Sequence, residues 1–486
     1  MNQRTIILAA LLSACAAPRP QVAQPELVGP WRGVLVAGAA RLEVVLHIAS
    51  SSDGYDATFD SVSQGVRDIP VASLARAGDQ VTALIPAIGA EFTAKIIRGA
   101  DAAMRLEGAW RQGGHELPLT LKPGDARPPR RPQLPGQEVP YEREEVAFGH
   151  DPAQSLEASF AAGAGAPVTL CGTLTLPRSP GPHPVAVMIT GSGPQDRDES
   201  LVGHKPFLVI ADHLTRRGVA VLRYDDRGTG ASTGDFLAGT TPDFAVDARA
   251  ALRYLRTRED IDHARMGLIG HSEGGLIAPM VATGPDRAMV SFAVLLAPPA
   301  VGICEIITRQ TELVLRANGD TEENIAFNNA MTRAALEALR ANRDDDAARA
   351  AAMRAVAEEY WPRLPAAARE QAENGVADVI ATLATLDTPW MNWIAHYDPA
   401  PALRAMRCDV LAVFGGKDLQ VEPAQNRPPL EAALAANAEV VTLDGLNHLF
   451  QTAETGSPAE YHAIEETFAP AALELVGEWV VARTRR

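Results

Sequence analysis

The sequence predicts an α/β protein: a doubly wound, mostly parallel sheet with a helical insertion, preceded by a small antiparallel β-barrel or sandwich domain. Three observations support this fold class. Short strands of alternating hydrophobicity fill the first part of the chain, and buried-type strands alternate with helical segments from residue 185 onward. An Ala-, Glu- and Arg-rich helical stretch then interrupts this alternation at about residues 302–396.

Composition sets the first bounds on function. The chain has 486 residues, of which 47% are apolar and 21% charged, so it is long enough for two or three domains with sizeable cores. Its formal net charge is −16. Because nucleic-acid binding requires a concentrated basic face, this charge argues against a nucleic-acid partner.

The N-terminus has the pattern of a secretory signal. A short apolar run at residues 5–12 follows Arg4, and it is too short to span a bilayer as a mature helix. The residues Leu12-Ser13-Ala14-Cys15 resemble a bacterial lipobox, in which Cys15 is lipidated and becomes the new N-terminus. We therefore expect a signal peptide at 1–15, a tether at 16–28 and a periplasmic or lipid-anchored envelope protein. Ordinary signal-peptidase cleavage within the same stretch is the alternative.

Residues 29–121 predict the β-rich N-terminal domain. Leu42, Val44, Leu46 and Ile48 alternate with more polar residues, and Gly-containing turn signals separate such segments. No cluster of titratable residues there indicates chemistry, so we expect a binding, packing or spacer role. Residues 122–140 contain six prolines and predict a linker to a second domain at 141–486.

The second domain alternates strands and helices in chain order. Expected strands cover residues 146–148, 168–176, 185–189, 219–224, 266–269, 290–296, 410–414 and 440–443. Expected helices cover residues 207–217, 244–256, 275–281, 430–434 and 461–481. Because the central strands are continuously apolar, we expect a parallel sheet that helices cover on both faces.

The segment Gly270-His271-Ser272-Glu273-Gly274 lies between an expected strand and an expected helix. A G-x-S-x-G pattern in this position is typical of a nucleophile elbow, a tight turn that exposes the serine Oγ at the top of a sheet. The glycines let the strand and the helix approach each other closely. The pattern is short enough to arise by chance, so its neighbours in the fold must support it.

An acid and a base follow Ser272 in the order that this fold requires. Asp418 comes just after the expected strand at 410–414, and His448 just after the strand at 440–443. All three residues therefore leave the carboxyl ends of sheet strands, where α/β proteins bind ligands. The rival acids are Asp444 and Glu422, and the rival bases are His396 and His462.

Acyl transfer also requires hydrogen-bond donors for the oxyanion. The backbone N–H of Glu273 is the expected first donor. The Gly-rich loop at residues 190–195 follows the first parallel strand, and Ser192 is the expected second donor, with Gly193 close behind. Arg227, after the next strand, is expected to hold loops together.

These motifs together resemble the α/β-hydrolase superfamily, and most of all its bacterial carboxylesterases and the serine peptidases that share the fold. The resemblance covers about residues 141–486. It implies Ser272 as nucleophile, Asp418 as orienting acid, His448 as base and residues 302–396 as a lid over an acyl pocket. The loop at residue 190 departs from the lipase His-Gly-Gly-Gly form, so the second oxyanion donor is not fixed by the resemblance.

The leading hypothesis is a serine hydrolase of carboxylic esters that uses no metal or cofactor and acts on a small-molecule substrate. Trp390, Trp393 and Tyr397 either line the acyl pocket or pack structurally. A serine peptidase is the alternative, in which Glu273, Asp196 and Asp198 would hold a substrate ammonium. A catalytically inactive envelope binding protein is a third hypothesis. Cys171, Cys304 and Cys408 are expected to be buried free thiols rather than a disulfide framework.

Overall fold

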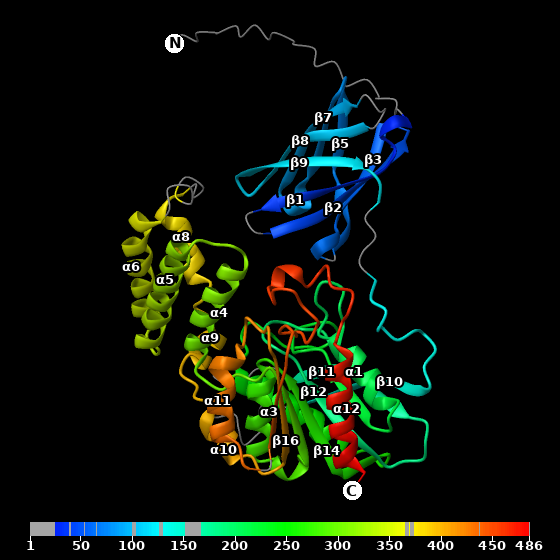
Figure 1. Ribbon diagram of the computed structural model, residues 1–486, viewed down its shortest axis with the longest axis vertical. Helices are drawn as coiled ribbons and strands as arrows, with labels where there is room; N and C mark the ends of the chain where they lie inside the picture. Colours follow the sequence, from blue (N-terminus) through cyan, green and yellow to red (C-terminus); the bar gives the residue numbers. More distant parts are fainter. Residues whose placement is uncertain are drawn as a thin grey trace, which may run out of the picture. The chain divides into compact units, whose positions relative to one another are not determined.

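The computed structural model describes residues 25–37, 40–52, 54–64, 66–99, 104–125, 130–150, 167–364, 369, 374–436 and 438–485 (Figure 1). The chain divides into two compact units, Met1–Pro128 and Pro129–Arg486. The expected signal peptide and Cys15 lie outside the described residues. Within the described part of the chain, no helix is both long enough and apolar enough to cross a membrane.

The described residues of the first unit form nine strands in one antiparallel sheet. The strands are β1 (Gly29–Ala37), β2 (Ala40–Ser51), β3 (Gly54–Ser61), β4 (Val66–Val71), β5 (Ser73–Ala77), β6 (Gln80–Ile85), β7 (Ala90–Arg98), β8 (Met104–Gln112) and β9 (His115–Pro123). Their order is β4-β3-β2-β1-β9-β8-β7-β6-β5. The sheet curls until β3 approaches β5, which makes it a nearly closed barrel. The predicted small antiparallel β-domain is confirmed.

Aromatic side chains fill the interior of this barrel. The rings of Phe59 and Trp110 stack with their centroids 4.8 Å apart, and the buried Trp31 donates its indole N–H to the Leu27 carbonyl at 2.8 Å. A Cβ atom at Gly108 would lie 2.0 Å from the Thr93 carbonyl oxygen. Glycine at this position therefore allows β7 and β8 to approach closely where the sheet curls.

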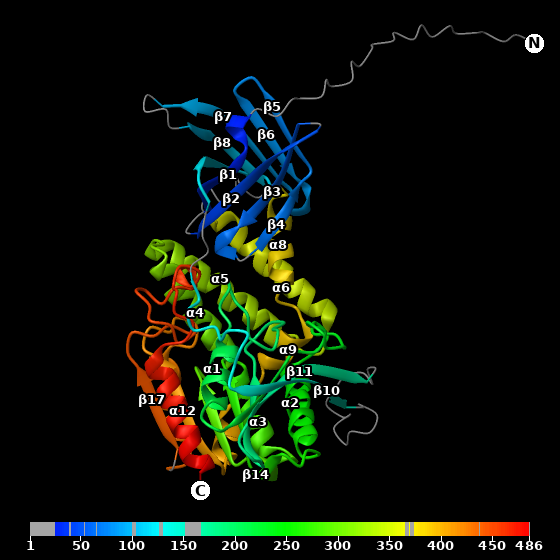
Figure 2. The same cartoon turned by 90° about the vertical axis from the view of Figure 1, so that its right-hand side faces the viewer.

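The described residues of the second unit form an eight-stranded mixed sheet (Figure 2). Its strands are β10 (Tyr141–His150), β11 (Val168–Pro177), β12 (His183–Ile189), β13 (Ala220–Tyr224), β14 (Ile261–His271), β15 (Phe292–Leu296), β16 (Asp409–Gly415) and β17 (Glu439–Leu443). The order is β10-β11-β13-β12-β14-β15-β16-β17. β11 pairs antiparallel with β10 and β13, and the strands from β13 to β17 are parallel.

Helices cover both faces of this sheet, as predicted. One face packs against α2 (Thr241–Leu255), α3 (Gly274–Thr283), α10 (Ala400–Ala405) and α11 (Pro423–Ala433). The other packs against α1 (Pro206–Thr215) and α12 (Pro470–Thr484). Every residue of β12, β13 and β15 is buried. Because both faces of these strands are covered, their sequences are mostly apolar rather than alternating, with Arg223 of β13 a buried exception.

The predicted helical insertion lies between β15 and β16. It contains α4 (Ile303–Ala317), α5 (Glu322–Ala341), α6 (Asp346–Tyr360), α8 (Val376–Ala384) and α9 (Pro389–Ile394), which form a layer outside the sheet (Figures 1 and 2). The insertion has its own apolar cluster, to which α3 contributes Leu276. Arg309 of α4 binds both carboxylate oxygens of Glu422, at 2.8 and 2.7 Å, and so ties the insertion to the start of α11.

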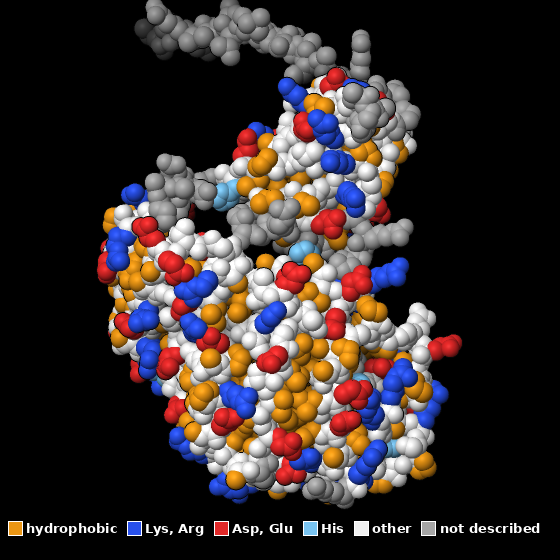
Figure 3. All heavy atoms as spheres, viewed as in Figure 1, with side chains coloured by type: hydrophobic (Ala, Val, Ile, Leu, Met, Phe, Trp, Pro, Cys, Tyr) orange, Lys and Arg blue, Asp and Glu red, His pale blue; other side chains and the backbone are white. Residues whose placement is uncertain are grey.

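Charged side chains of both signs are interspersed over the face shown in Figure 3. Oppositely charged side chains form ion pairs on the insertion. The Arg316 guanidinium, for example, contacts the carboxylates of Glu312 and Glu322 at 2.7 and 2.9 Å. Such exposed pairs contribute little to stability, because water screens their charges.

The final helix was predicted too long. It begins at Pro470 rather than near residue 461, and His462 therefore lies in a turn before it. Proline favours the first turn of a helix and disfavours helical backbone in the residue before it, so Pro470 sets this start. Tertiary hydrogen bonds also hold the preceding segment: Gln133 accepts the Thr467 and Phe468 amides at 2.6 and 3.0 Å.

Candidate active site

Ser272 occupies the turn between β14, which ends at His271, and α3, which begins at Gly274. Its φ of 52° is unusual for a residue with a side chain, and its amide donates to the Leu296 carbonyl at 2.8 Å. A Cβ at Gly270 would lie 2.1 Å from the Gly274 carbonyl oxygen, and one at Gly274 would lie 2.2 Å from that of Ile189. The two glycines thus permit the tight strand–turn–helix that holds Ser272 in this strained conformation.

The structure brings Asp418 and His448 into direct contact. The Asp418 Oδ2 atom lies 2.7 Å from His448 Nδ1, and both side chains are buried. The other carboxylate oxygen accepts the amides of Gln420 and Val421 at 2.8 and 2.9 Å, which fixes the orientation of Asp418. Because a carboxylate accepts hydrogen bonds, it places the proton on Nδ1 and leaves Nε2 as the basic atom.

His271 and Gly191 connect the elbow with its surroundings. The ring of His271, next to Ser272, lies with its centroid 4.7 Å from that of His448. A Cβ at Gly191, in the loop after β12, would lie 3.3 Å from the Ser272 Cβ atom. The elbow, the Gly-rich loop and the Asp418–His448 pair therefore meet at the carboxyl edge of the sheet.

The rival acids and bases have other environments. Asp444 is exposed, and Glu422 is engaged with Arg309. The ring nitrogens of His396 lie 3.0 and 3.1 Å from the carbonyls of Asn392 and Arg340, within the insertion. His462 faces the Ala459 carbonyl at 3.1 Å. These contacts assign a different role to each rival, and the structure pairs His448 with Asp418.

The expected oxyanion donors lie on two elements. Glu273 precedes the first residue of α3, where backbone N–H groups have no acceptor in a preceding turn. In the Gly-rich loop, the Gly191 amide already donates to Glu199 Oε1 at 2.8 Å, whereas Ser192 is exposed and Gly193 has a φ of 91°. Ser192 stays the predicted second donor.

The side chain of Glu273 points away from solvent and joins three elements. Its Oε1 atom accepts the Thr241 hydroxyl of α2 and the Trp390 indole N–H of α9, each at 2.7 Å. The Ser192 side chain also hydrogen-bonds this carboxyl, and burial raises its pKa above the ordinary value. Glu273 therefore couples the elbow to α2, to the end of the insertion and to the Gly-rich loop.

The three aromatic residues proposed for an acyl pocket all have packing partners. Trp390 is bound to Glu273, as described above. The rings of Trp393 and Tyr397 stack at 4.9 Å and pack against the apolar cluster of the insertion. Burial raises the pKa of Tyr397 to about 12. All three side chains therefore pack at the junction of insertion and core, and their place in an acyl pocket stays a prediction.

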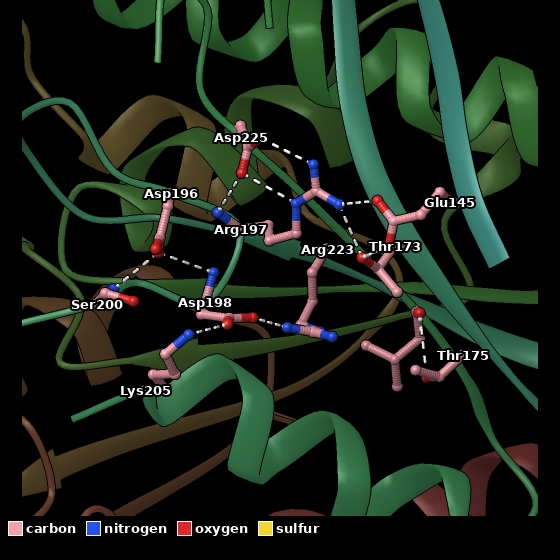
Figure 4. Close-up of polar contacts among 11 residues, drawn as sticks. Glu145, Thr173, Thr175, Asp196, Arg197, Asp198, Ser200, Lys205, Arg223 and Asp225 are labelled. Atoms are coloured by element: carbon pink, nitrogen blue, oxygen red, sulfur yellow. Dashed lines mark hydrogen bonds and ion pairs between the residues drawn. The ribbon is translucent and has the colours of Figure 1, made fainter. Parts of the chain in front are cut away.

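The acidic residues proposed to bind a substrate ammonium are engaged within the protein (Figure 4). Asp198 pairs with Arg223 and, at 3.0 Å, with Lys205. Asp196 accepts the amides of Asp198 and Ser200 at 3.0 and 2.9 Å. With Glu273 buried as well, these carboxylates do not converge on a common ligand position.

Figure 4 also shows what sequence reasoning missed: two arginine–aspartate pairs hold residues 195–205, which we call the anchored loop. The Arg197 guanidinium binds both oxygens of Asp225 at 3.0 and 2.8 Å and also contacts Glu145. Arg223, buried on β13, contacts Asp198. Arg and Asp residues are too common for the sequence alone to reveal which of them pair.

Sequence reasoning also missed Asp226 and the role of Glu199. Asp226 accepts the Thr190 hydroxyl and the Gln195 amide at 2.8 and 3.0 Å, and burial raises its pKa to about 8. Arg227, expected to hold loops together, binds both oxygens of Asp247 in α2 at 2.7 and 2.9 Å. Glu199, in the anchored loop, contacts His271 Nδ1 at 2.9 Å.

Neither a metal cluster nor a disulfide is found in the described part of the chain. No group of three or more His, Cys, Asp or Glu side chains there has an arrangement suited to a metal ion. The described cysteines, Cys171, Cys304 and Cys408, are unpaired and half-buried rather than fully buried. Burial raises the pKa values of the Cys304 and Cys408 thiols, the latter to about 11. A raised thiol pKa disfavours the reactive thiolate form.

In a comparison with known proteins, residues 200–463 match the alpha/beta hydrolase family. A curated relative, Esterase EstD of Thermotoga maritima, is 29% identical over 294 residues, which cover 60% of this chain and 61% of the relative's length.

Two solved structures are similar to this chain at low identity. Est1E of Butyrivibrio proteoclasticus with bound ferulic acid has 18% identity and a TM-score of 0.39, over 66% of this chain and 97% of that one. The Pyrococcus furiosus esterase Pf2001 has 15% identity and a TM-score of 0.39, over 74% of this chain and 99% of that one.

Proposed function

We propose that this chain, which belongs to the alpha/beta hydrolase family, is a serine esterase that cleaves carboxylic esters through an acyl-enzyme on Ser272. One observation carries the proposal: the buried Asp418–His448 contact of 2.7 Å lies at the same sheet edge as a serine held at a φ of 52°. The relative named as an esterase supports ester substrates.

In the proposed reaction, His448 Nε2 removes the proton of the Ser272 hydroxyl as its oxygen attacks the ester carbonyl. Asp418 holds the histidine in the required tautomer and stabilises the imidazolium that forms. The Glu273 and Ser192 amides donate hydrogen bonds to the oxyanion. His448 then returns the proton to the leaving alcohol, and water, activated by the same base, hydrolyses the acyl-enzyme.

Labelling with a fluorophosphonate probe tests the nucleophile. We expect the wild-type protein to be labelled and Ser272→Ala to be unlabelled, because only an activated serine reacts with the probe. Ser179→Ala, at an exposed serine outside the site, is the matched control and should label like the wild type. A folded wild-type protein that resists the probe would contradict the proposal.

A comparison of substrates tests the preference for esters over peptides. The carboxylates that a peptidase would use for a substrate ammonium are engaged with Arg223, Lys205, Thr241 and Trp390. We therefore expect turnover of short-chain nitrophenyl esters and little turnover of aminoacyl anilides. Efficient anilide cleavage with negligible ester cleavage would instead identify a peptidase.

A further inference from the structure

His271 lies between three parts of the site. It is the last residue of β14, directly before Ser272, and its side chain is buried. Its Nδ1 atom lies 2.9 Å from Glu199 Oε1, and its Nε2 atom lies 3.0 Å from the backbone carbonyl oxygen of His448. The same Glu199 oxygen accepts the Gly191 amide at 2.8 Å. One carboxylate and one imidazole thus connect the Gly-rich loop, the elbow and the backbone of the proposed base.

The partners of His271 determine its protonation. The His448 carbonyl is only an acceptor, so Nε2 must carry a proton to bond with it. Glu199 accepts the Gly191 amide, and an ionised carboxylate next to Nδ1 requires a proton on that nitrogen too. Both contacts are therefore satisfied together when His271 is an imidazolium paired with the Glu199 carboxylate. The titratable groups that face His271 are Glu199, His448 and Asp418.

The electrostatics agree with this geometry. Burial lowers the pKa of His271, but the Glu199 charge and the hydrogen bonds to Glu199 and His448 outweigh burial and raise it overall. The anchored loop keeps Glu199 in position: Asp198, directly before it, binds Arg223, and Arg197, two residues before it, binds Asp225 (Figure 4). Glu199 itself has a φ of 53°, a conformation that this anchoring maintains.

We propose that Glu199 and His271 are a positioning pair, in which the ionised pair fixes the His448 backbone and the Gly-rich loop relative to Ser272. The inference rests on the proposed function, because it assigns a role to two residues that serve the same serine. Neither side chain contacts the reacting atoms. Their effect is on the alignment of base, nucleophile and oxyanion donors, where a misplacement of about 1 Å can lower the rate about a hundredfold.

We expect the proposed pair to make kcat fall at alkaline pH. Above the raised pKa of His271 the ring loses one proton, and one of its two nitrogens then faces its partner without a hydrogen to donate. The His448 backbone or the Gly-rich loop is released, and kcat falls.

Kinetics of two variants test the pair. We expect His271→Gln and Glu199→Gln to lower kcat roughly ten- to hundredfold with little change in KM. His271→Gln should also lack the alkaline decline, and Glu199→Gln should move that decline to lower pH because the imidazolium loses its counter-charge. His263→Gln, at an exposed histidine on the same strand, and Glu259→Gln, at an exposed glutamate, are the matched controls.

A spectroscopic measurement on the wild-type protein tests the pair independently of activity. In protein labelled with ¹⁵N-histidine, we expect both ring nitrogens of His271 to give imidazolium resonances at pH values above the ordinary histidine pKa of about 6.5. His271→Gln assigns these resonances by their loss. A neutral His271 ring at neutral pH would overturn the proposal.

The outcomes separate the two proposals. A wild-type protein that is not labelled by fluorophosphonate overturns the esterase proposal, and the protonation of His271 then decides the ion pair by itself. A labelled, active wild type together with variants that keep its kcat and its pH profile overturns the positioning pair alone. Lower kcat, the changed alkaline limb and an imidazolium signal together support the pair.

Discussion

At the residue scale, Glu273 combines two roles in one position of the elbow. Its backbone precedes the first turn of α3 and is the proposed oxyanion donor, whereas its carboxyl is buried against Thr241 and Trp390. Both of these donors bind the same oxygen, Oε1. Because burial disfavours a charged carboxyl, this residue makes the stability of the domain depend on pH.

We predict that Glu273→Gln changes that dependence. The pKa of Glu273 is raised above 4.5 in the folded protein, so between pH 4.5 and the folded pKa the native state retains a proton that the unfolded state has lost. Wild-type stability therefore falls as pH rises through this window, by about 1.4 kcal/mol for each tenfold change in proton affinity.

Glutamine keeps the accepting oxygen and removes the titration. Urea unfolding at a series of pH values should show that Glu273→Gln lacks this part of the decline, whereas the exposed Glu259→Gln keeps it. Parallel pH curves for the wild type and Glu273→Gln would contradict the prediction.

Asp418 is the second test at this scale. We predict that Asp418→Asn lowers ester turnover by about 10⁴-fold while the protein stays folded, because an amide favours the wrong histidine tautomer and removes the negative charge beside the imidazolium. The matched control is Asp444→Asn at an exposed position in the neighbouring loop, which should turn over ester like the wild type. Steady-state kinetics of the two variants measure this difference in turnover, and an active Asp418→Asn would exclude Asp418 as the orienting acid.

At the scale of elements, the site depends on how closely a strand, a turn and a helix approach. Gly274 begins α3 where the helix meets the carboxyl end of β12, and Gly275 faces Pro298 after β15. The anchored loop adds a second constraint, since Arg197 attaches it to Asp225 just after β13 and to β10, and Arg223 of β13 binds Asp198. The conformation of the elbow is therefore imposed by its neighbours as well as by its own sequence.

We predict that Gly274→Ala disturbs this junction. The added Cβ would lie 2.2 Å from the Ile189 carbonyl oxygen, so helix and strand must separate. Overpacking of this kind typically costs about 1–3 kcal/mol of stability, and the displaced turn should also lower ester turnover. Gly136→Ala, where the added Cβ meets nothing within 4 Å, is the control. Unfolding midpoints and kcat measure both effects, and wild-type values for Gly274→Ala would contradict the packing argument.

At the scale of the whole molecule, the chain combines a nearly closed β-barrel unit with a hydrolase unit that carries a helical insertion. The first unit has its own apolar core, the hydrolase unit has one on each face of its sheet, and the insertion has a further one. The insertion meets the hydrolase core through Trp390 and through the Arg309–Glu422 pair. Movement of the insertion would therefore act on Glu273 next to the nucleophile.

The envelope location of the whole protein is a prediction from the sequence around Cys15. We expect the protein to fractionate with membranes and to incorporate labelled fatty acid when it is expressed in a bacterial host. Cys15→Ser should abolish both, because a lipid anchor needs the thiol. Cys171→Ser, in the hydrolase unit, is the control and should stay with the membranes. Equal membrane association and no lipid label in either variant would contradict lipidation.

The sequence alone predicted the fold class and the residues at the ends of three strands. This was possible because strand, helix and turn patterns are local, and because parallel strands bring their carboxyl ends to one edge whatever their exact packing. It did not predict Glu199 with His271, Arg197 with Asp225, Glu273 with Trp390, or the start of α12 at Pro470. These features depend on residues that are distant in the chain and on which side chains the packed elements bring together, and only the tertiary structure decides that.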